Sequence, residues 1–79
     1  MPPILYTLPQ CAHCDTARTL LAELNLPYRE IVIDNPVLEV GMKTALGKVL
    51  APVLLQPNGD FHFLVEIAPS VYRFVRLLV

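Results

Sequence analysis

The sequence has few of the residues on which several common classes of protein depend. It contains only two cysteines and three glycines, and its six basic residues are outnumbered by seven acidic ones. Two cysteines are too few to hold together a small secreted domain built on several disulfides. The three glycines form no phosphate-binding loop, and the scattered Lys and Arg residues form no stripe for a nucleic-acid backbone. We therefore expect no nucleic-acid binding.

Long apolar runs are also missing, although 54% of the residues are hydrophobic and the mean hydropathy is +0.52. Prolines interrupt the apolar stretches, and no run approaches the roughly 18 residues of a membrane-spanning helix. The first residues include no basic segment before a long apolar core, so we expect no signal peptide. The length of 79 residues fits one domain over residues 1–79, which we expect to be soluble, cytoplasmic and monomeric.

Short β-favouring runs predict four strands, at residues 4–7, 28–33, 52–55 and 61–64. The second run ends in Ile31-Val32-Ile33, which suits a strand covered on both faces. The turn 57–60 reads Pro-Asn-Gly-Asp and joins the last two strands, because Asn and Gly accept positive φ.

Helical spacing predicts three helices between and after these strands. The first has apolar residues at i, i+3, i+4 and i+7, and Asn25 and Pro27 end it. The second begins at Asn35-Pro36, a polar cap followed by proline, and ends at Gly47. The third begins near Pro69, and its apolar residues again follow the helical spacing: Val71, Phe74, Val75 and Leu78.

The resulting order, β-α-β-α-β-β-α, predicts an α/β fold with a four-stranded mixed sheet and three helices. A strand, a helix and a strand in succession give a parallel pair with a right-handed crossover. The closing hairpin has to be antiparallel, and the helices cover the faces of the sheet.

The reactive residues are concentrated in Cys11-Ala12-His13-Cys14, between the first strand and the first helix. At the start of a helix, residues i and i+3 share a face, so the two sulfurs lie within disulfide reach. Cys11 is at the helix N-terminus, where free N–H groups and the helix dipole favour a thiolate. We therefore expect Cys11 to attack a substrate disulfide and Cys14 to resolve the mixed disulfide.

Two other interpretations of the cysteine pair remain open. A zinc site needs four ligands, and only His13 and His62 are left to supply the second pair. His13 projects away from both cysteines on a helix, which makes it a poor ligand, and His62 is expected to face solvent. The second alternative is that the two cysteines are an inert part of the core. A CxxC motif that opens a helix in a βαβ unit is, however, the pattern of redox-active cysteines. We expect no metal site.

The segment from Tyr6 to Cys14 resembles the active-site stretch of the glutaredoxins and of the NrdH-type redoxins, in the thioredoxin superfamily. The resemblance continues to about Gly59 and implies a thioredoxin-like fold. It implies a cis peptide at Ala51-Pro52, with Ala51 pairing through its backbone with the substrate. It also implies that Tyr6 and Gln10 belong to the substrate-binding surface. No cofactor is implied beyond the redox-active Cys11–Cys14 disulfide.

The sequence departs from the family where glutathione binds. Glutaredoxins have a Gly-Gly pair and an acidic residue after the hairpin, whereas this chain has the bulky stretch 62–66. The family lysine two residues after the tyrosine is Leu8 here. A ligand with two carboxylates needs cationic partners and backbone donors, so we expect glutathione to bind poorly.

His13 predicts a further property of the cysteine pair. A histidine between the cysteines favours the Cys11 thiolate, stabilises the reduced form and raises the redox potential. We expect a potential less negative than the roughly −270 mV of thioredoxin. The alternative is a solvated histidine with no role.

The sequence as a whole predicts a small dithiol–disulfide oxidoreductase. Its electrons come from glutathione or a flavoprotein reductase, and it passes them to a disulfide in a protein substrate or a small molecule. The alternative is a redox-regulated binding module, in which the Cys11–Cys14 pair is a switch and the apolar hairpin contacts a partner. Repeated turnover of a model disulfide distinguishes the two.

Overall fold

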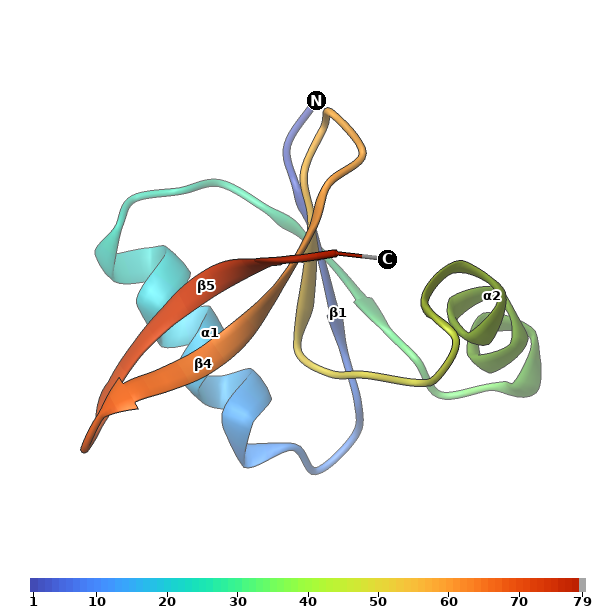
Figure 1. Cartoon of the computed structure of the whole chain (residues 1–79), viewed down its shortest axis with the longest axis horizontal. Coiled ribbons are helices and arrows are strands. Elements are labelled where there is room, and N and C mark those ends of the chain that lie inside the picture. The colour runs from blue at the N-terminus through green and yellow to red at the C-terminus, as the bar shows by residue number, and fades with distance from the viewer. Residues whose placement is uncertain (79) are drawn as a thin grey trace.

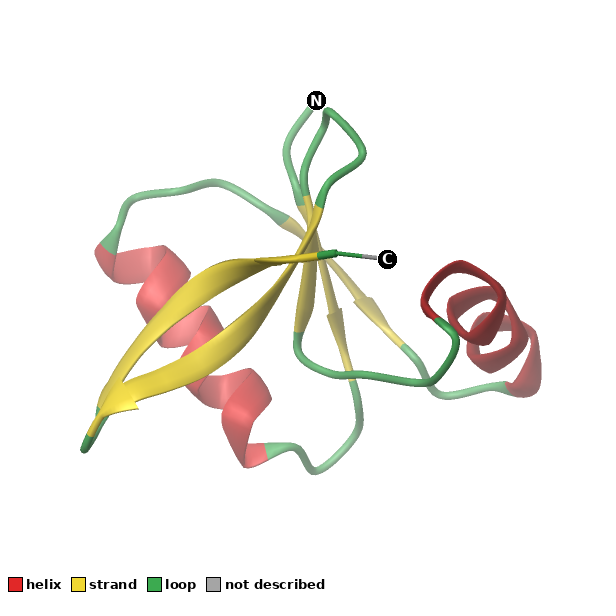
Figure 2. Cartoon of the chain, in the orientation of Figure 1, coloured by secondary structure: helices red, strands yellow, loops and turns green. Residues whose placement is uncertain are grey.

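The structure, a computed structural model that describes residues 1–78, is a five-stranded mixed sheet with one helix on each face (Figures 1 and 2). The sheet order is β2-β1-β3-β4-β5; β1 and β2 are parallel, and all other neighbours are antiparallel. The elements in chain order are β1 (Ile4–Thr7), α1 (Ala12–Glu23), β2 (Arg29–Val32), α2 (Pro36–Leu46), β3 (Val53–Leu55), β4 (Phe61–Ala68) and β5 (Val71–Leu77).

Two small apolar cores lie on the two faces of the sheet. The core on the α1 side contains the buried residues Leu5, Ala17, Leu21 and Leu54. The core on the α2 side contains Ile33, Met42, Leu46 and Val53. Successive strand residues point to opposite faces, so the neighbours Val53 and Leu54 each fill a different core. The central strand β3 is therefore covered on both sides.

The predicted boundaries of α2 are confirmed, and both are set by local chemistry. The Asn35 side chain accepts a hydrogen bond from the Leu38 backbone N–H at 3.0 Å, and Pro36 is the first helical residue. At the other end, Gly47 adopts the left-handed conformation with φ 85°, and its N–H donates to the Lys43 carbonyl at 2.8 Å.

The predicted third helix is wrong, because residues 71–77 form strand β5, and the sheet has five strands and two helices rather than four and three. β4 is correspondingly longer than predicted and continues to Ala68, where a tight turn with Ser70 at φ 61° reverses the chain. The apolar residues have helical spacing because β5 contributes to both cores. Phe74 packs against the α1 core and Leu77 against the α2 core. Leu64 and Phe63 pair with Phe74 and Val75 across the hairpin and favour the strand.

The second strand also differs from its prediction. β2 lies at an edge of the sheet and is mostly exposed, with only Ile31 half-buried. Its apolar end is explained by the position of Ile33, which follows the strand and fills the α2 core. Within residues 1–78, no helix is long and apolar enough to cross a membrane.

Candidate active site

Cys11 is the N-cap of α1 and is held there by the local backbone. It has extended φ and ψ of −112° and 107°, and its Sγ accepts a hydrogen bond from the Cys14 backbone N–H at 3.2 Å. The Cys11 carbonyl accepts from the Asp15 N–H at 3.3 Å. The Cys14 N–H and the positive end of the helix dipole therefore face the Cys11 sulfur. The local structure therefore favours a thiolate at Cys11.

The two cysteines differ in their exposure to solvent. They form a disulfide with 5.2 Å between their Cα atoms, a spacing within the usual range for such a bond. Cys14 is completely buried, whereas Cys11 is partly exposed. Cys11 is therefore the cysteine of the pair that a molecule in solution can contact.

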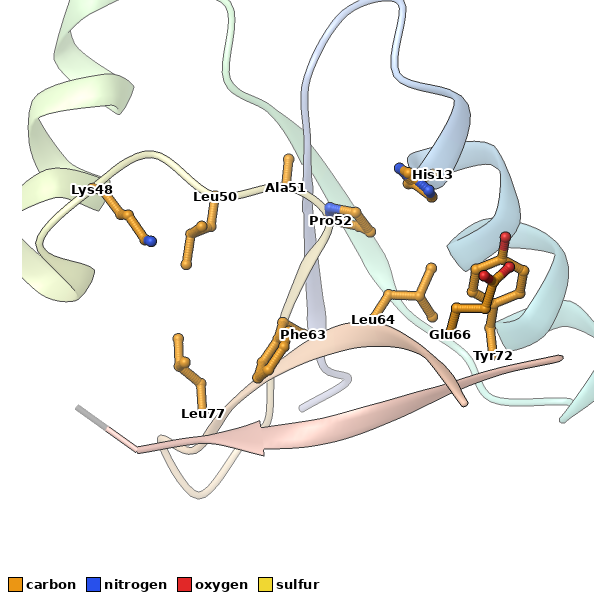
Figure 3. A pocket seen from close by; sticks show the side chains of 10 residues that line it. All are labelled: His13, Lys48, Leu50, Ala51, Pro52, Phe63, Leu64, Glu66, Tyr72 and Leu77. Atoms are coloured by element: carbon orange, nitrogen blue, oxygen red, sulfur yellow. The ribbon is translucent and has the colours of Figure 1, made fainter. Parts of the chain in front are cut away.

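A groove of about 360 Å³ runs along the loop before β3 and the β4–β5 hairpin (Figure 3). Tyr6 of β1 is opposite Val53 of β3 in an antiparallel pair, so the segment after β1 and the segment before β3 meet at the same end of the sheet. The peptide between Ala51 and Pro52 is cis, as the resemblance implies, and both residues line the groove. His13 lines it from the start of α1.

The groove does not contain every residue expected at the substrate surface. Tyr6 instead lines a separate apolar cavity of about 250 Å³, together with Phe61 of β4 and Met42 of α2. Gln10 is exposed in the loop before Cys11, with φ 55°, and is not among the groove residues. His62, expected to face solvent, is half-buried in β4, and its Nδ1 has no hydrogen-bond partner among the described residues.

The hairpin adds residues to the groove that the sequence analysis missed. Tyr72 of β5 contacts the His13 ring edge-on, with the ring centres 6.4 Å apart and an interplanar angle of 63°. A hydrogen bond to the Glu66 carboxylate raises the pKa of the Tyr72 hydroxyl, with smaller contributions from desolvation and from the Glu66 charge. Tyr72 was missed because the apolar spacing from Val71 predicted a helix there. Lys48 was missed because it lies in a loop, where no periodic pattern marks it.

A polar network behind the cysteine pair connects three elements of the fold. The buried Thr7 hydroxyl donates to Glu30 Oε2 at 2.9 Å. Arg18 donates to both oxygens of the same carboxylate, at 2.9 and 2.7 Å, and also pairs with Asp15. The Arg18 hydrogen bond lowers the pKa of Glu30 and in turn raises the pKa of Arg18, against an opposing effect of desolvation on both. The network fixes the start of α1 against β1 and β2.

A metal site would need several ligand side chains close together. Over the described part of the chain, no group of three or more His, Cys, Asp or Glu side chains is arranged to hold a metal ion.

Comparison with known proteins identifies similar chains. The glutaredoxin family model matches residues 4–61, a range that contains both cysteines and Pro52. Among solved structures, the solution structure of a glutaredoxin from Brucella melitensis is 30% identical and superimposes with a TM-score of 0.59. That match covers 70% of this chain and 61% of the other, so this chain spans about three fifths of that protein's length. No protein in the search of curated proteins matches significantly.

Proposed function

Because this chain belongs to the glutaredoxin family, we propose that it is a dithiol–disulfide oxidoreductase that reduces disulfides in other proteins. The carrying observation is the unequal placement of the cysteines: Cys11 is partly exposed at the N-terminus of α1, and Cys14 is buried one turn behind it. The groove beside Pro52 offers a substrate a place to bind, and it is also lined by His13, two residues after Cys11 in the chain.

The reaction takes place in two exchanges. The Cys11 thiolate attacks one sulfur of the substrate disulfide, forming a mixed disulfide and releasing the other sulfur as a thiolate that takes up a proton. The Cys14 thiol then loses its proton and attacks Cys11, which closes the Cys11–Cys14 disulfide and releases the second substrate thiol. The protein loses two electrons, and the substrate gains two electrons and two protons.

We further propose that no cofactor is needed beyond the two thiols, and that the protein works in the cytoplasm. Its electrons come from glutathione or from a flavoprotein reductase. We expect glutathione to bind poorly, because the bulky side chains of Phe63 and Leu64 line the groove. In the family, two glycines in this stretch let the ligand approach the backbone. Leu8 offers no cation to a carboxylate, which supports the same conclusion.

The proposal is tested by alkylating the reduced protein over a range of pH and locating the label by mass spectrometry. We expect fast labelling at Cys11 alone, with a midpoint clearly below the free-thiol value of about 8.5. In a Cys14→Ser variant, the reaction with a protein disulfide should stop at the mixed disulfide with Cys11. Slow and equal labelling of both cysteines in the wild type would refute an activated nucleophile.

A redox-regulated binding module is the second candidate, supported by the apolar lining that Leu50, Phe63 and Leu77 give the groove. The two candidates differ in turnover. An oxidoreductase supplied with excess reductant converts many equivalents of a model disulfide, whereas a switch is oxidised once and changes its affinity for a partner.

A further inference from the structure

We propose that the groove selects an extended polypeptide segment by its charge order, with an acidic side chain at Lys48, a basic side chain at Glu66 and the reacting cysteine between them. The inference rests on the proposed function, because the bound segment is the substrate of the Cys11 exchange. It adds a specificity for one order of charges around the substrate cysteine.

The middle of the groove is apolar, and its two ends carry opposite charges. Figure 3 shows Lys48 at one end and Glu66 with Tyr72 and His13 at the other. The residues between the two ends are the apolar side chains Leu50, Pro52, Phe63 and Leu64. A ligand that fits this lining has an apolar centre and opposite charges at its two ends.

The charge of Lys48 is free to meet a substrate. Lys48 is exposed just after Gly47, where α2 has ended. Within residues 1–78, the side-chain ion pairs involve Arg18 with Asp15 and Glu30, and Arg76 with Asp60, so none of them occupies Lys48. An acidic side chain of a bound segment therefore has no internal competitor at this end.

The opposite end is built to present a carboxylate. Tyr72 lies directly across the hairpin from Glu66, and the interaction with this carboxylate raises the pKa of the Tyr72 hydroxyl. The Ser70 backbone N–H also donates to Glu66 Oε2, at 3.4 Å. The cross-strand pairing and the Ser70 contact place the carboxylate at the rim of the groove beside Tyr72. A carboxylate next to an aromatic ring is a favourable place for a lysine or arginine side chain.

A segment of polypeptide fits these features better than a small disulfide does. In an extended chain, the residues two positions before and two positions after a cysteine share its face, and the chain carries them toward the two ends of the groove at about 3.3 Å per residue. The apolar lining accepts apolar side chains near the cysteine, and the end charges fix which way the segment runs. Two unlike charges at the rim act more on the choice and direction of the partner than on total affinity.

The test uses two peptides of identical composition that differ only in charge order. One has Asp two residues before its single cysteine and Lys two residues after it, and the other has Lys and Asp exchanged, so the charged side chains share the face of the cysteine. Each peptide is joined through a disulfide to 2-mercaptoethanol, which is uncharged. The reduced protein is mixed with each peptide in a single turnover, and the released peptide thiol is measured after acid quenching. Equal net charge removes any effect of overall attraction.

We expect the wild-type protein to react with one order about three to ten times faster than with the other at low salt, as two exposed charge pairs allow. The double variant Lys48→Glu/Glu66→Lys should invert the preference. The matched control Lys43→Glu/Glu39→Lys makes the same change of charge on α2, away from the groove, and should keep the wild-type preference.

Equal rates for the two orders, or the same preference in wild type and double variant, would overturn the inference. A mixed disulfide of glutathione that reacts faster than both peptides, and loses this advantage in the double variant, would also overturn it, because the charges would then serve the tripeptide. Bis(2-hydroxyethyl) disulfide distinguishes a failure of the charge-order inference from a failure of the proposed function. Reaction of the wild type with this uncharged disulfide but no order preference rejects only the inference, whereas no reaction with any disulfide rejects the proposed function.

Discussion

Replacing Glu30 by glutamine should destabilise the fold at neutral pH and leave it almost unaffected at low pH. The substitution keeps an oxygen for the Thr7 hydroxyl but removes the charge that Arg18 contacts with two hydrogen bonds. The side chains are partly exposed, 34% for Arg18 and 26% for Glu30, so the pair is worth less than a buried one. We expect a loss of about 1 kcal/mol, or roughly 4–8 °C in Tm for a domain of this size.

The pH dependence follows from the direction of the pKa shift. Arg18 and Thr7 hold the pKa of Glu30 below its unfolded value, which is about 4.3. A carboxylate with a lowered folded pKa stabilises the fold fully above the unfolded pKa, and the contribution is lost as the pH falls through the folded value. The difference between wild type and Glu30→Gln should therefore be full at pH 7 and disappear progressively below about pH 4.

Urea unfolding at a series of pH values measures this difference directly. The control is Glu23→Gln, an exposed carboxylate at the end of α1 that makes no ion pair within residues 1–78, and its effect should stay within about 0.5 kcal/mol. A Glu30→Gln variant as stable as wild type at pH 7 would refute the reasoning. A destabilisation that is equal at pH 7 and pH 3 would show that geometry, not charge, holds the network together.

Three further predictions concern the cap of α2, the half-buried His62 and the histidine between the cysteines. Gly47→Ala should cost about 1 kcal/mol in thermal unfolding because φ is 85° there, whereas Gly41→Ala, inside α2 with open space around it, should stabilise by about 0.5–1 kcal/mol; equal effects contradict the argument. His62→Phe should be neutral or stabilising by up to about 1 kcal/mol in urea, because it removes an unpaired buried nitrogen, and a clear loss of stability would mean that Nδ1 has a partner. His13→Val should make the redox potential more negative, by on the order of 30 mV, in equilibration with a glutathione buffer, and an unchanged potential leaves His13 without a tuning role.

Features that depend on a few neighbouring residues were predictable from the sequence. Asn35, Pro36 and Gly47 set the ends of α2 through contacts within one helical turn, and the structure contains all three as expected. Cys11 and Cys14 were recognisable for the same reason, because their spacing alone brings both sulfurs to the start of one helix.

The segment that forms β5 was not predictable in this way. The spacing of Val71, Phe74 and Val75 fits one face of a helix, and it also fits a strand with apolar side chains on both faces. The choice is made by partners that are distant in the sequence, since Phe63 and Leu64 pair across the hairpin with Val75 and Phe74. A helix pattern read from a single segment contains no information about these partners.

The substitution of a strand for the expected helix also changes what the end of the chain does. A helix packed on one face of the sheet would contribute to one core. β5 reaches three places: Phe74 packs on the α1 core, Leu77 packs on the α2 core, and Tyr72 contacts His13 beside the cysteine pair. Phe74 and Leu77, which pack against the two cores, therefore lie on the same strand as Tyr72, which lines the groove. The position of Tyr72 in the groove consequently depends on the packing on both faces of the sheet.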